Sequence, residues 1–410
     1  MQGVLGEDRI SVRRRLRGVR GAASRPGGFR GADPPLAEST VTARIERIVA
    51  YRVELPFVEG DYAISGGRVA RGLDSTVVAI HTDTGDAGWG EMAPLGATYA
   101  PAFAGGARAA LAELAPALVG LDARAPVAAS LVMDRTLRGH PYAKSPLDIA
   151  LWDLAARLAG LPLAALLGGR FGDTVDVYRA LPIDEPDATS DLARVYVRQG
   201  YRRLQVKVGD DPADDLERLA ATRLAVGDGV TLFADANGGW STSDARRFLH
   251  GLRDDGVVVE QPCATIEECA AIRAACPRPI VLDESIDSLE ALIKARDLGV
   301  ADGITIKIAR VGGITPARLI RDAAVSLRIP VTIEDTGGAE IDTAAIAQLA
   351  LSTPEALRMH AYPFHELVTI SNADGMPPVR DGRLTPPPGN GLGVEPRQDA
   401  LGEPIFEFAG

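Results

Sequence analysis

The sequence predicts an α/β protein in which a (β/α)8 barrel of the TIM type follows a smaller α+β domain. Five short apolar runs each end in a charged residue: Lys207, Asp235, Glu260, Asp283 and Lys307. Successive runs lie about 25 residues apart, the length of a strand, a helix and two short loops. Alanines and leucines at helical spacing fill the stretches between the runs, which is typical of strand–helix repeats around a parallel barrel.

The barrel is expected over residues 171–361. Residues 175–180 predict its first strand, the five apolar runs its second to sixth, and residues 331–335 and 356–360 its seventh and eighth. Helices are expected between them, over 187–199, 213–225, 243–253, 266–275, 287–297, 315–326 and 341–351. Seven intervals of similar length are what closure by eight strands requires.

The α+β domain is expected over residues 41–170. Apolar patterns over 44–55 and 73–81 predict two strands, and a third begins at Gly88. Helical periodicity then follows over 101–118, 126–138 and 144–160. The glycine-rich stretch 59–67 is long for a hairpin loop, so it is either a lid over a site or disordered.

The two ends of the chain differ in composition from its middle. Residues 1–40 hold eight arginines, no lysine and no apolar periodicity, which predicts a disordered Arg-rich extension. An organelle transit peptide, or a start site assigned too far upstream, would also explain it. Residues 362–410 are rich in Pro and Gly and are expected to return and pack on the first domain.

Composition excludes several classes of partner. The net charge of −11 argues against nucleic acid. No apolar run approaches the roughly 18 residues of a membrane span, so no membrane is expected. Three cysteines without metal-ligand or redox spacing fit a reducing compartment, and the basic start has no secretory core after it. We therefore expect a cytoplasmic enzyme or binding protein.

The charged residues would meet at the carboxyl ends of the barrel strands, where active sites of such barrels lie. Lys207 on the second strand and Lys307 on the sixth would face each other across the mouth. Asp235, Glu260 and Asp283 would occupy the arc between them. Three converging carboxylates repel one another unless they share a cation, and oxygen ligands alone favour Mg²⁺, with Mn²⁺ as the alternative.

A cation beside two opposed lysines predicts proton removal next to a carboxylate. The metal would bind the carboxylate of a small-molecule or amino-acid substrate and stabilise the negative charge that forms. One lysine would take the α-proton, and the other would deliver a proton or assist a leaving group. A single charged residue at a strand end is more often a surface charge, but five in register favour a site.

Weaker candidates surround this set. Asn237 is a ligand, a donor to a ligand, or a helix-start residue, and the sequence leaves these open. Asp335 and Thr336 after the seventh strand are candidates for the substrate's amino group or hydroxyl. His360 at the end of the eighth strand could touch substrate, although a structural histidine is the commoner case.

Taken together, these motifs resemble the enolase superfamily, in its mandelate racemase/muconate lactonizing enzyme branch. Lys207 matches the second lysine of the branch's Lys-x-Lys motif, and Lys307 matches its sixth-strand lysine. The resemblance implies that Asp235, Glu260 and Asp283 are metal ligands. It also implies that the first domain caps the barrel, that Tyr62–Gly67, including Ser65, forms a specificity loop, and that the protein is a homo-oligomer.

Two departures from the pattern of this branch narrow the resemblance to a smaller group within it. Gln205 stands where many relatives have the first lysine of Lys-x-Lys, and Glu334–Gly338 supplies no histidine on the seventh strand. The sequence is most similar to the group that contains cis-3-hydroxy-L-proline dehydratases and hydroxyproline betaine epimerases. Thr336, in place of a tryptophan suited to cation–π contact, favours the dehydratase. A racemase or epimerase of a proline derivative and a non-catalytic barrel are the alternatives.

Overall fold

The computed structural model describes residues 43–410. The extension over residues 1–40, predicted to be disordered, lies outside the described residues. Within residues 43–410, no helix is both long and apolar enough to cross a membrane.

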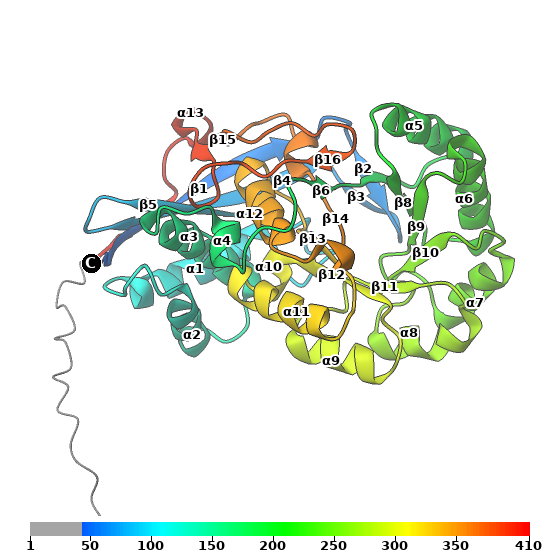
Figure 1. The fold of residues 1–410 in the computed structure, drawn as a ribbon, viewed down its shortest axis with the longest axis horizontal. Helices are drawn as coiled ribbons and strands as arrows, with labels where there is room; N and C mark the ends of the chain where they lie inside the picture. Colours follow the sequence, from blue (N-terminus) through cyan, green and yellow to red (C-terminus); the bar gives the residue numbers. More distant parts are fainter. Residues whose placement is uncertain (1–42) are drawn as a thin grey trace, which may run out of the picture. The chain divides into compact units, whose positions relative to one another are not determined.

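An antiparallel sheet forms the first part of the described chain. Its strand order is β18-β1-β4-β5, with β1 at Ile45–Pro56, β4 at Gly72–Thr82, β5 at Ala87–Met92 and β18 at Phe406–Ala409. The last strand comes from the C-terminal end of the chain and pairs with β1 (Figure 1). Helix α3, Pro141–Leu158, packs on this sheet with nearly all of its residues buried.

Two more helices, α1 (Ala104–Leu118) and α2 (Pro126–Thr136), complete the cover of the sheet. Their leucines and alanines share an apolar cluster with Ile45, Ile48 and the inner face of α3. A small hairpin between β1 and β4 occupies the glycine-rich stretch, with β2 at Tyr62–Ile64 and β3 at Arg68–Ala70. We call the sheet, its helices and this hairpin the cap.

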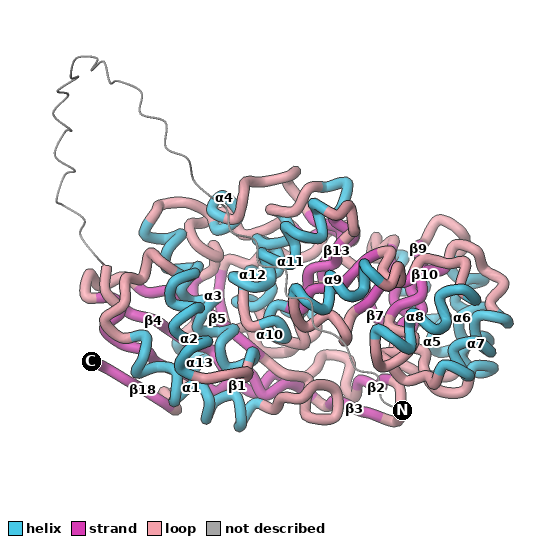
Figure 2. The backbone as a smooth tube through the Cα atoms, turned by 90° about the horizontal axis from the view of Figure 1, so that it is seen from below, coloured by secondary structure: helices cyan, strands magenta, loops and turns pink. Residues whose placement is uncertain are grey.

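Eight parallel strands follow one another in sequence order around a barrel (Figures 1 and 2). They are β7 (Arg179–Leu181), β8 (Arg203–Lys207), β9 (Thr231–Asp235), β10 (Val257–Glu260), β11 (Ile280–Leu282), β12 (Gly303–Lys307), β13 (Val331–Glu334) and β14 (Arg358–Ala361). A parallel bridge between Val177 and Ala361 joins the two edges. The predicted barrel with its preceding α+β layer is confirmed.

Helices alternate with these strands on the outside. They are α5 (Pro186–Arg198), α6 (Pro212–Val226), α7 (Thr242–Gly251), α8 (Ile266–Ile272), α9 (Leu289–Asp297), α11 (Ile314–Ser326) and α12 (Glu340–Leu351). Four of them begin at a side chain that accepts a hydrogen bond from the first turn: Asp211, Ser241, Thr265 and Ser288. A short helix, α10 (Ile308–Val311), follows β12 directly.

The remaining elements are short. They are α4 (Leu163–Leu166), β6 (Val175–Asp176), β15 (Ala373–Asp374), β16 (Arg383–Leu384), β17 (Glu395–Pro396), α13 (Gln398–Leu401) and the 3₁₀ turns Arg273–Ala275, Glu355–Leu357 and Phe364–Glu366.

The first barrel strand was predicted over residues 175–180, and this prediction is wrong at its start. Residues Val175 and Asp176 form β6, which pairs with β16 of the C-terminal segment, and the barrel strand begins at Arg179. Asp176 also forms ion pairs with Arg203 at 2.7 Å and Arg383 at 3.3 Å. A partner some 200 residues along the chain leaves no local signal in an apolar run.

Glycines let the cap sheet approach α3 closely. A Cβ atom on Gly90 of β5 would lie 2.1 Å from the carbonyl oxygen of Pro146 and 2.8 Å from the amide nitrogen of Ala150. Gly88 is in a similar position against Ala150 and Leu154. Both backbones belong to regular elements, so neither can move far to make room.

We predict that Gly90→Ala lowers the free energy of unfolding by about 1–3 kcal/mol, because the added methyl group forces β5 and α3 apart. Thermal unfolding followed by calorimetry measures the change. Gly229→Ala is the matched control, because a Cβ atom there meets nothing within 4 Å. Equal melting temperatures for the two variants would contradict the close approach.

Candidate active site

The predicted charged residues lie together at one end of the barrel. Lys207, Asp235 and Glu260 are the last residues of adjacent strands, and the strand register places them side by side. Asp283 follows β11 directly, and Lys307 ends β12. All five side chains are buried. Parallel strands of similar length bring their carboxyl ends to one level, which is why a sequence repeat becomes a cluster in space.

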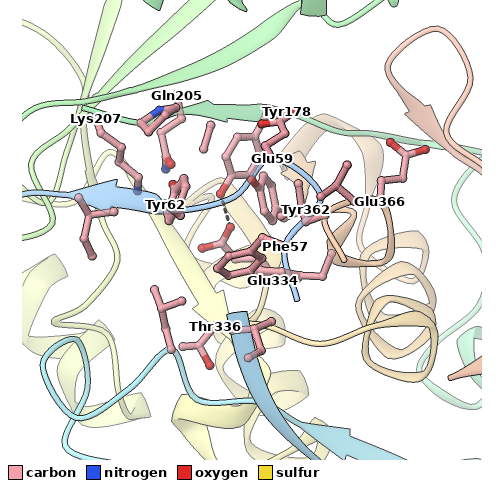
Figure 3. A pocket seen from close by; sticks show the side chains of 18 of the residues that line it. Phe57, Glu59, Tyr62, Tyr178, Gln205, Lys207, Glu334, Thr336, Tyr362 and Glu366 are labelled. Atoms are coloured by element: carbon pink, nitrogen blue, oxygen red, sulfur yellow. Dashed lines mark hydrogen bonds between the residues drawn. The ribbon is translucent and has the colours of Figure 1, made fainter. Parts of the chain in front are cut away.

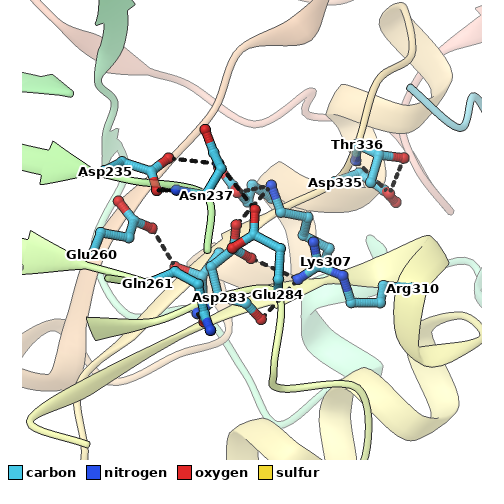
Figure 4. Close-up of polar contacts among 12 residues, drawn as sticks. Asp235, Asn237, Glu260, Gln261, Asp283, Glu284, Lys307, Arg310, Asp335 and Thr336 are labelled. Atoms are coloured by element: carbon cyan, nitrogen blue, oxygen red, sulfur yellow. Dashed lines mark hydrogen bonds and ion pairs between the residues drawn. The ribbon is translucent and has the colours of Figure 1, made fainter. Parts of the chain in front are cut away.

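Both lysines are bound to carboxylates. The Nζ atom of Lys207 lies 2.5 Å from Oδ2 of Asp235, and that of Lys307 lies 3.2 Å from Oδ2 of Asp283. Asp283 also accepts a hydrogen bond from Nη1 of Arg310 at 2.6 Å, as Figure 4 shows. Buried charges are stable only when paired in this way.

Glu260 is held by neutral donors instead of a cation. The amide Nε2 of Gln205 donates to its Oε2 at 2.8 Å, and the hydroxyl of Thr305 donates to its Oε1 at 3.1 Å. Burial, together with the charges of Asp235 and Asp283, raises the pKa of Glu260 well above its usual range. Gln205, where many relatives have a lysine, therefore gives an uncharged donor to a carboxylate whose pKa is raised.

Asn237 links two carboxylates from the loop after β9. Its Nδ2 donates to Oδ2 of Asp235 and to Oε1 of Glu284, both at 2.9 Å, and its backbone has a φ of 45°. The buried Oδ1 of Asn237 and Oε2 of Glu284 have no hydrogen-bond partner among the described residues. Burial, and the nearby charges of Asp283 and Asp235, raise the pKa of Glu284 to about 7.

This donor set fits a hard divalent cation. The available atoms are carboxylate and amide oxygens, and two buried oxygens lack a partner. The charges of Asp235 and Asp283 lie close enough to raise the pKa values of Glu260 and Glu284. Within residues 43–410, no three His, Cys, Asp or Glu side chains are already grouped as a ligand cage. Asp283 is instead bound to Lys307 and Arg310, as Figure 4 shows.

The same ion pairs set the lysines' protonation. Burial favours neutral lysine, but the charge of Asp235 outweighs it and raises the pKa of Lys207 above its ordinary value. For Lys307, burial is again outweighed, by Asp283 and Glu334, and the pKa lies well above its ordinary value. Both lysines are therefore ammonium ions while these carboxylates remain their partners.

A cavity of about 410 Å³ opens at this end of the barrel. Figure 3 shows side chains that line it, Lys207 and Glu334 among them. Both lysines line it, from β8 and β12. The other predicted residues in its wall are Tyr62, Gln205, Asn237, Asp335 and Thr336. The first cap loop and the loop after β13 thus close over the charged end of the barrel.

Asp335 and Thr336 are both committed to protein contacts. The carboxylate of Asp335 accepts from the backbone of Ala309 and of Thr336, each at 2.7 Å, and burial raises its pKa to about 6. The hydroxyl of Thr336 donates to the carbonyl oxygen of Ala93 in the cap at 3.0 Å. A substrate group could still donate to the Thr336 oxygen.

Ser65 and His360 lie behind the cavity wall. Ser65 is fully buried, and its hydroxyl accepts from Arg68 at 2.6 Å, which fixes the β2–β3 hairpin. His360 packs between Tyr178 and Phe233, tilted against the first and edge-to-face with the second, with ring centres 4.6 and 4.8 Å away. Burial lowers the pKa of His360 to about 3, so the ring is neutral.

Five residues of this region were not among the sequence-derived candidates: Tyr99, Tyr178, Glu284, Arg310 and Glu334. Glu334 accepts from Nζ of Lys307 at 2.7 Å and from the hydroxyl of Tyr178. It lies opposite Lys307 in the strand register, so the predicted seventh strand could have revealed it. The aromatic residues and Arg310 lie in or beside loops and carry no comparable periodic signal.

Two family models match the chain. The model described as the N-terminal domain of mandelate racemase / muconate lactonizing enzyme matches residues 68–168, and the model described as enolase C-terminal domain-like matches residues 188–400.

Curated relatives include a dehydratase and epimerases. Cis-3-hydroxy-L-proline dehydratase of Roseibium aggregatum is 43% identical over 366 residues, which are 89% of this chain and 100% of the relative. D-Ala-D/L-Ala epimerase of Cytophaga hutchinsonii is 33% identical over 285 residues, 68% of this chain and 76% of the relative.

Solved structures are similar to this fold along nearly the whole described chain. A member of the enolase superfamily from Roseovarius nubinhibens, complexed with magnesium, has a TM-score of 0.85 and 39% identity, covering 90% of this chain and 100% of that one. A dipeptide epimerase from Cytophaga hutchinsonii with Mg and D-Ala-L-Val has a TM-score of 0.84 and 28% identity, covering 89% and 99%. The resemblance is confirmed: the chain is an enzyme of the enolase superfamily, in its mandelate racemase/muconate lactonizing enzyme branch.

Proposed function

We propose that this enzyme is a Mg²⁺-dependent dehydratase that removes water from a 3-hydroxyproline-type amino acid such as cis-3-hydroxy-L-proline. One observation carries the proposal: Lys207 and Lys307 reach the same cavity from strands four places apart in the barrel, with the acidic cluster between them. The 43% identity with a dehydratase of that substrate, along 89% of this chain, supports it.

Asp235, Glu260 and Asp283 are the residues proposed to hold the metal, with Asn237 and Gln205 as amide donors to them. A bound Mg²⁺ would supply positive charge that offsets these carboxylates and polarises the substrate carboxylate. Mn²⁺ is the alternative ion, since it prefers similar oxygen ligands. The magnesium in a structural neighbour with 39% identity favours Mg²⁺.

The stereochemistry of the substrate suits two opposed lysines. In cis-3-hydroxy-L-proline, the hydroxyl and the carboxylate lie on the same face of the ring. The α-hydrogen therefore lies on the face opposite the hydroxyl, and a base on one face must work with an acid on the other. A single acid–base group could not serve both faces.

The proposed reaction needs no further reactant. One lysine, which would be the amine once a bound metal ion takes over its carboxylate partner, takes the α-proton, and the electrons of the C–H bond form a double bond to the β-carbon. The bond from the β-carbon to the hydroxyl breaks, its electron pair leaves with oxygen, and the other lysine, as ammonium, protonates it to water. The enamine that remains is a tautomer of a cyclic imine.

Epimerisation at the same carbon is the second candidate. It uses the same two lysines, one to remove the α-proton and the other to return a proton to the opposite face. Its support is the set of epimerases among the relatives, such as the D-Ala-D/L-Ala epimerase with 33% identity. Thr336 in the cavity wall, in place of a tryptophan, favours the dehydratase over an epimerase of betaines.

Incubation with cis-3-hydroxy-L-proline and Mg²⁺ in D₂O separates the two candidates. Elimination gives an imine and loses the hydroxyl, whereas epimerisation gives deuterated substrate of either configuration with the hydroxyl retained. Proton NMR follows both. The proposed function is wrong if no imine forms and no α-proton of any proline derivative exchanges.

The proposed domain boundaries are an α+β capping domain over residues 41–170, a catalytic barrel over 171–361 and a returning segment over 362–410, which adds β18 to the sheet of the cap. The pairing of β18 with β1 supports the last of these.

We predict that Lys207→Ala and Lys307→Ala each reduce turnover by about 1,000-fold, because positioned acid–base groups contribute roughly 10²–10⁴-fold. Steady-state imine formation measures the loss, and circular dichroism checks folding. Lys294→Ala is the control, because that lysine lies on the surface beside Glu267. Near-normal turnover in either cavity variant would remove that lysine from its proposed role.

Magnesium affinity should rise with pH. Burial and neighbouring charges raise the pKa of Glu284 to about 7 and the pKa of Glu260 well above its usual range. At a pH below its pKa, each carboxylate binds a proton that competes with the cation. Binding must then release a proton, and the apparent affinity should increase up to about tenfold per pH unit between pH 6 and 8. Calorimetric titration in two buffers measures both quantities. Glu284→Gln should flatten the dependence near pH 7, and an unchanged slope would contradict this assignment.

A further inference from the structure

Tyr99 brings the cap into contact with Lys307. It lies in the segment between β5 and α1, lines the cavity, and has no role in the reaction as proposed above. Its ring packs against a small apolar cluster that joins Ala100 and Ala107 of the cap to Ala309 beside β12. Its backbone N–H donates to the carbonyl oxygen of Gly96 at 3.0 Å, which closes a turn. The apolar cluster therefore packs against the ring, and the turn fixes the backbone that carries it.

Three cationic side chains surround the ring. Nζ of Lys307 lies 5.4 Å from the ring centre, and the guanidinium carbons of Arg310 and Arg68 lie at 5.9 and 6.0 Å. These distances are within the range of cation–π attraction, about 6 Å. Among residues 43–410 no aromatic ring lies over Lys207 in the same way. The contact distinguishes the two lysines.

The hydroxyl of Tyr99 extends the contact to the acid beside Lys307. It accepts a hydrogen bond from Nη2 of Arg310 at 3.1 Å and donates to Oδ2 of Asp283 at 3.4 Å. Arg310 in turn binds both the backbone oxygen and Oδ1 of Asp283, at 2.8 and 2.6 Å. Ring and hydroxyl thus contact every group of the Lys307–Asp283–Arg310 cluster.

Arg68 of the β2–β3 hairpin links that hairpin to the ring of Tyr99. Its guanidinium donates to the backbone oxygen of Ser65 at 2.7 Å and, more weakly, to those of Thr98 and Asn237, each at 3.4 Å. Hairpin, second cap segment and barrel therefore meet at one aromatic side chain.

We propose that Tyr99 is the positioning residue for Lys307: its ring is the third wall around the ammonium, beside the carboxylates of Asp283 and Glu334. The two carboxylates hold the ammonium at 3.2 and 2.7 Å, and the ring closes the side toward the cap. By positioning Lys307, the ring promotes proton transfer on that face of the substrate. It does not affect proton transfer by Lys207 on the other face. This inference rests on the proposed α-proton transfer.

The first test does not depend on activity. Lys144, Lys207, Lys294 and Lys307 are the four lysines of the chain, so protein labelled with ¹³C-lysine has few ε-methylene signals. The signal of Lys307 is the one that disappears in Lys307→Arg. An aromatic ring above the group shifts it upfield, so Tyr99→Leu should move it downfield, while Tyr99→Phe should leave it near its original position. An unmoved signal in Tyr99→Leu overturns the proposal.

The second test compares the two faces. Deuterium exchange at the α-carbon is measured for both enantiomers of proline in D₂O, and Lys207→Ala and Lys307→Ala identify which enantiomer depends on which lysine. Tyr99→Leu should slow the Lys307-dependent exchange about tenfold and the other less than about threefold. Tyr99→Phe should recover most of the loss. Phe103→Leu, in the same segment but exposed, is the control.

The outcomes separate the two proposals. Equal slowing on both faces would make Tyr99 a general part of the cap's closure and overturn its assignment to Lys307. If the wild-type enzyme exchanges no α-proton and forms no imine from cis-3-hydroxy-L-proline, the proposed function fails, and the lysine signals alone decide whether the ring holds Lys307.

Discussion

The compensation of buried charge is the constraint on which the rest of this structure depends. Asp235, Glu260, Asp283, Glu284 and Glu334 lie together at the mouth of the barrel, and all but the half-buried Glu284 are buried. Each isolated carboxylate there would cost several kcal/mol, so lysines, an arginine and amides must meet them. The resulting network of short contacts, with raised pKa values where compensation is incomplete, holds the groups that the chemistry uses.

Hydrogen bonds between the cap and the barrel compensate buried carboxylates in the same way. Glu91 of β5 is fully buried and accepts from the backbone of Ala339 and Asp342 at the start of α12, each at 3.0 Å. Asp148 of α3 accepts from Thr315 of α11 at 2.6 Å. These bonds cross from β5 and α3 of the cap to α12 and α11 of the barrel, and they hold the cap on the end of the barrel where the lysines lie. A cap attached only by apolar contacts would leave those loops less precisely placed.

Much of the fold and the charged set could be predicted because both are periodic. A strand–helix repeat of about 25 residues shows in the apolar pattern, and its carboxyl ends show where Lys207 to Lys307 must gather. The start of the first barrel strand could not be predicted, because Val175 pairs with Leu384, far along the chain. Ser65 was a candidate only as part of the loop that the resemblance implies, and His360 was a weaker candidate than a structural histidine. Neither side chain lines the cavity, and both are held by protein contacts.

The sequence by itself determined the barrel, the identity of its five charged residues and the resemblance that Gln205 and Thr336 narrow, because each depends on residue type and spacing along the chain. Only the tertiary structure decided how those charges are shared. That Gln205 binds Glu260, that Arg310 shares Asp283 with Lys307, and that a tyrosine of the cap faces just one of the two lysines are contacts between distant segments. Their distances follow from how cap and barrel pack, and no local pattern encodes that packing.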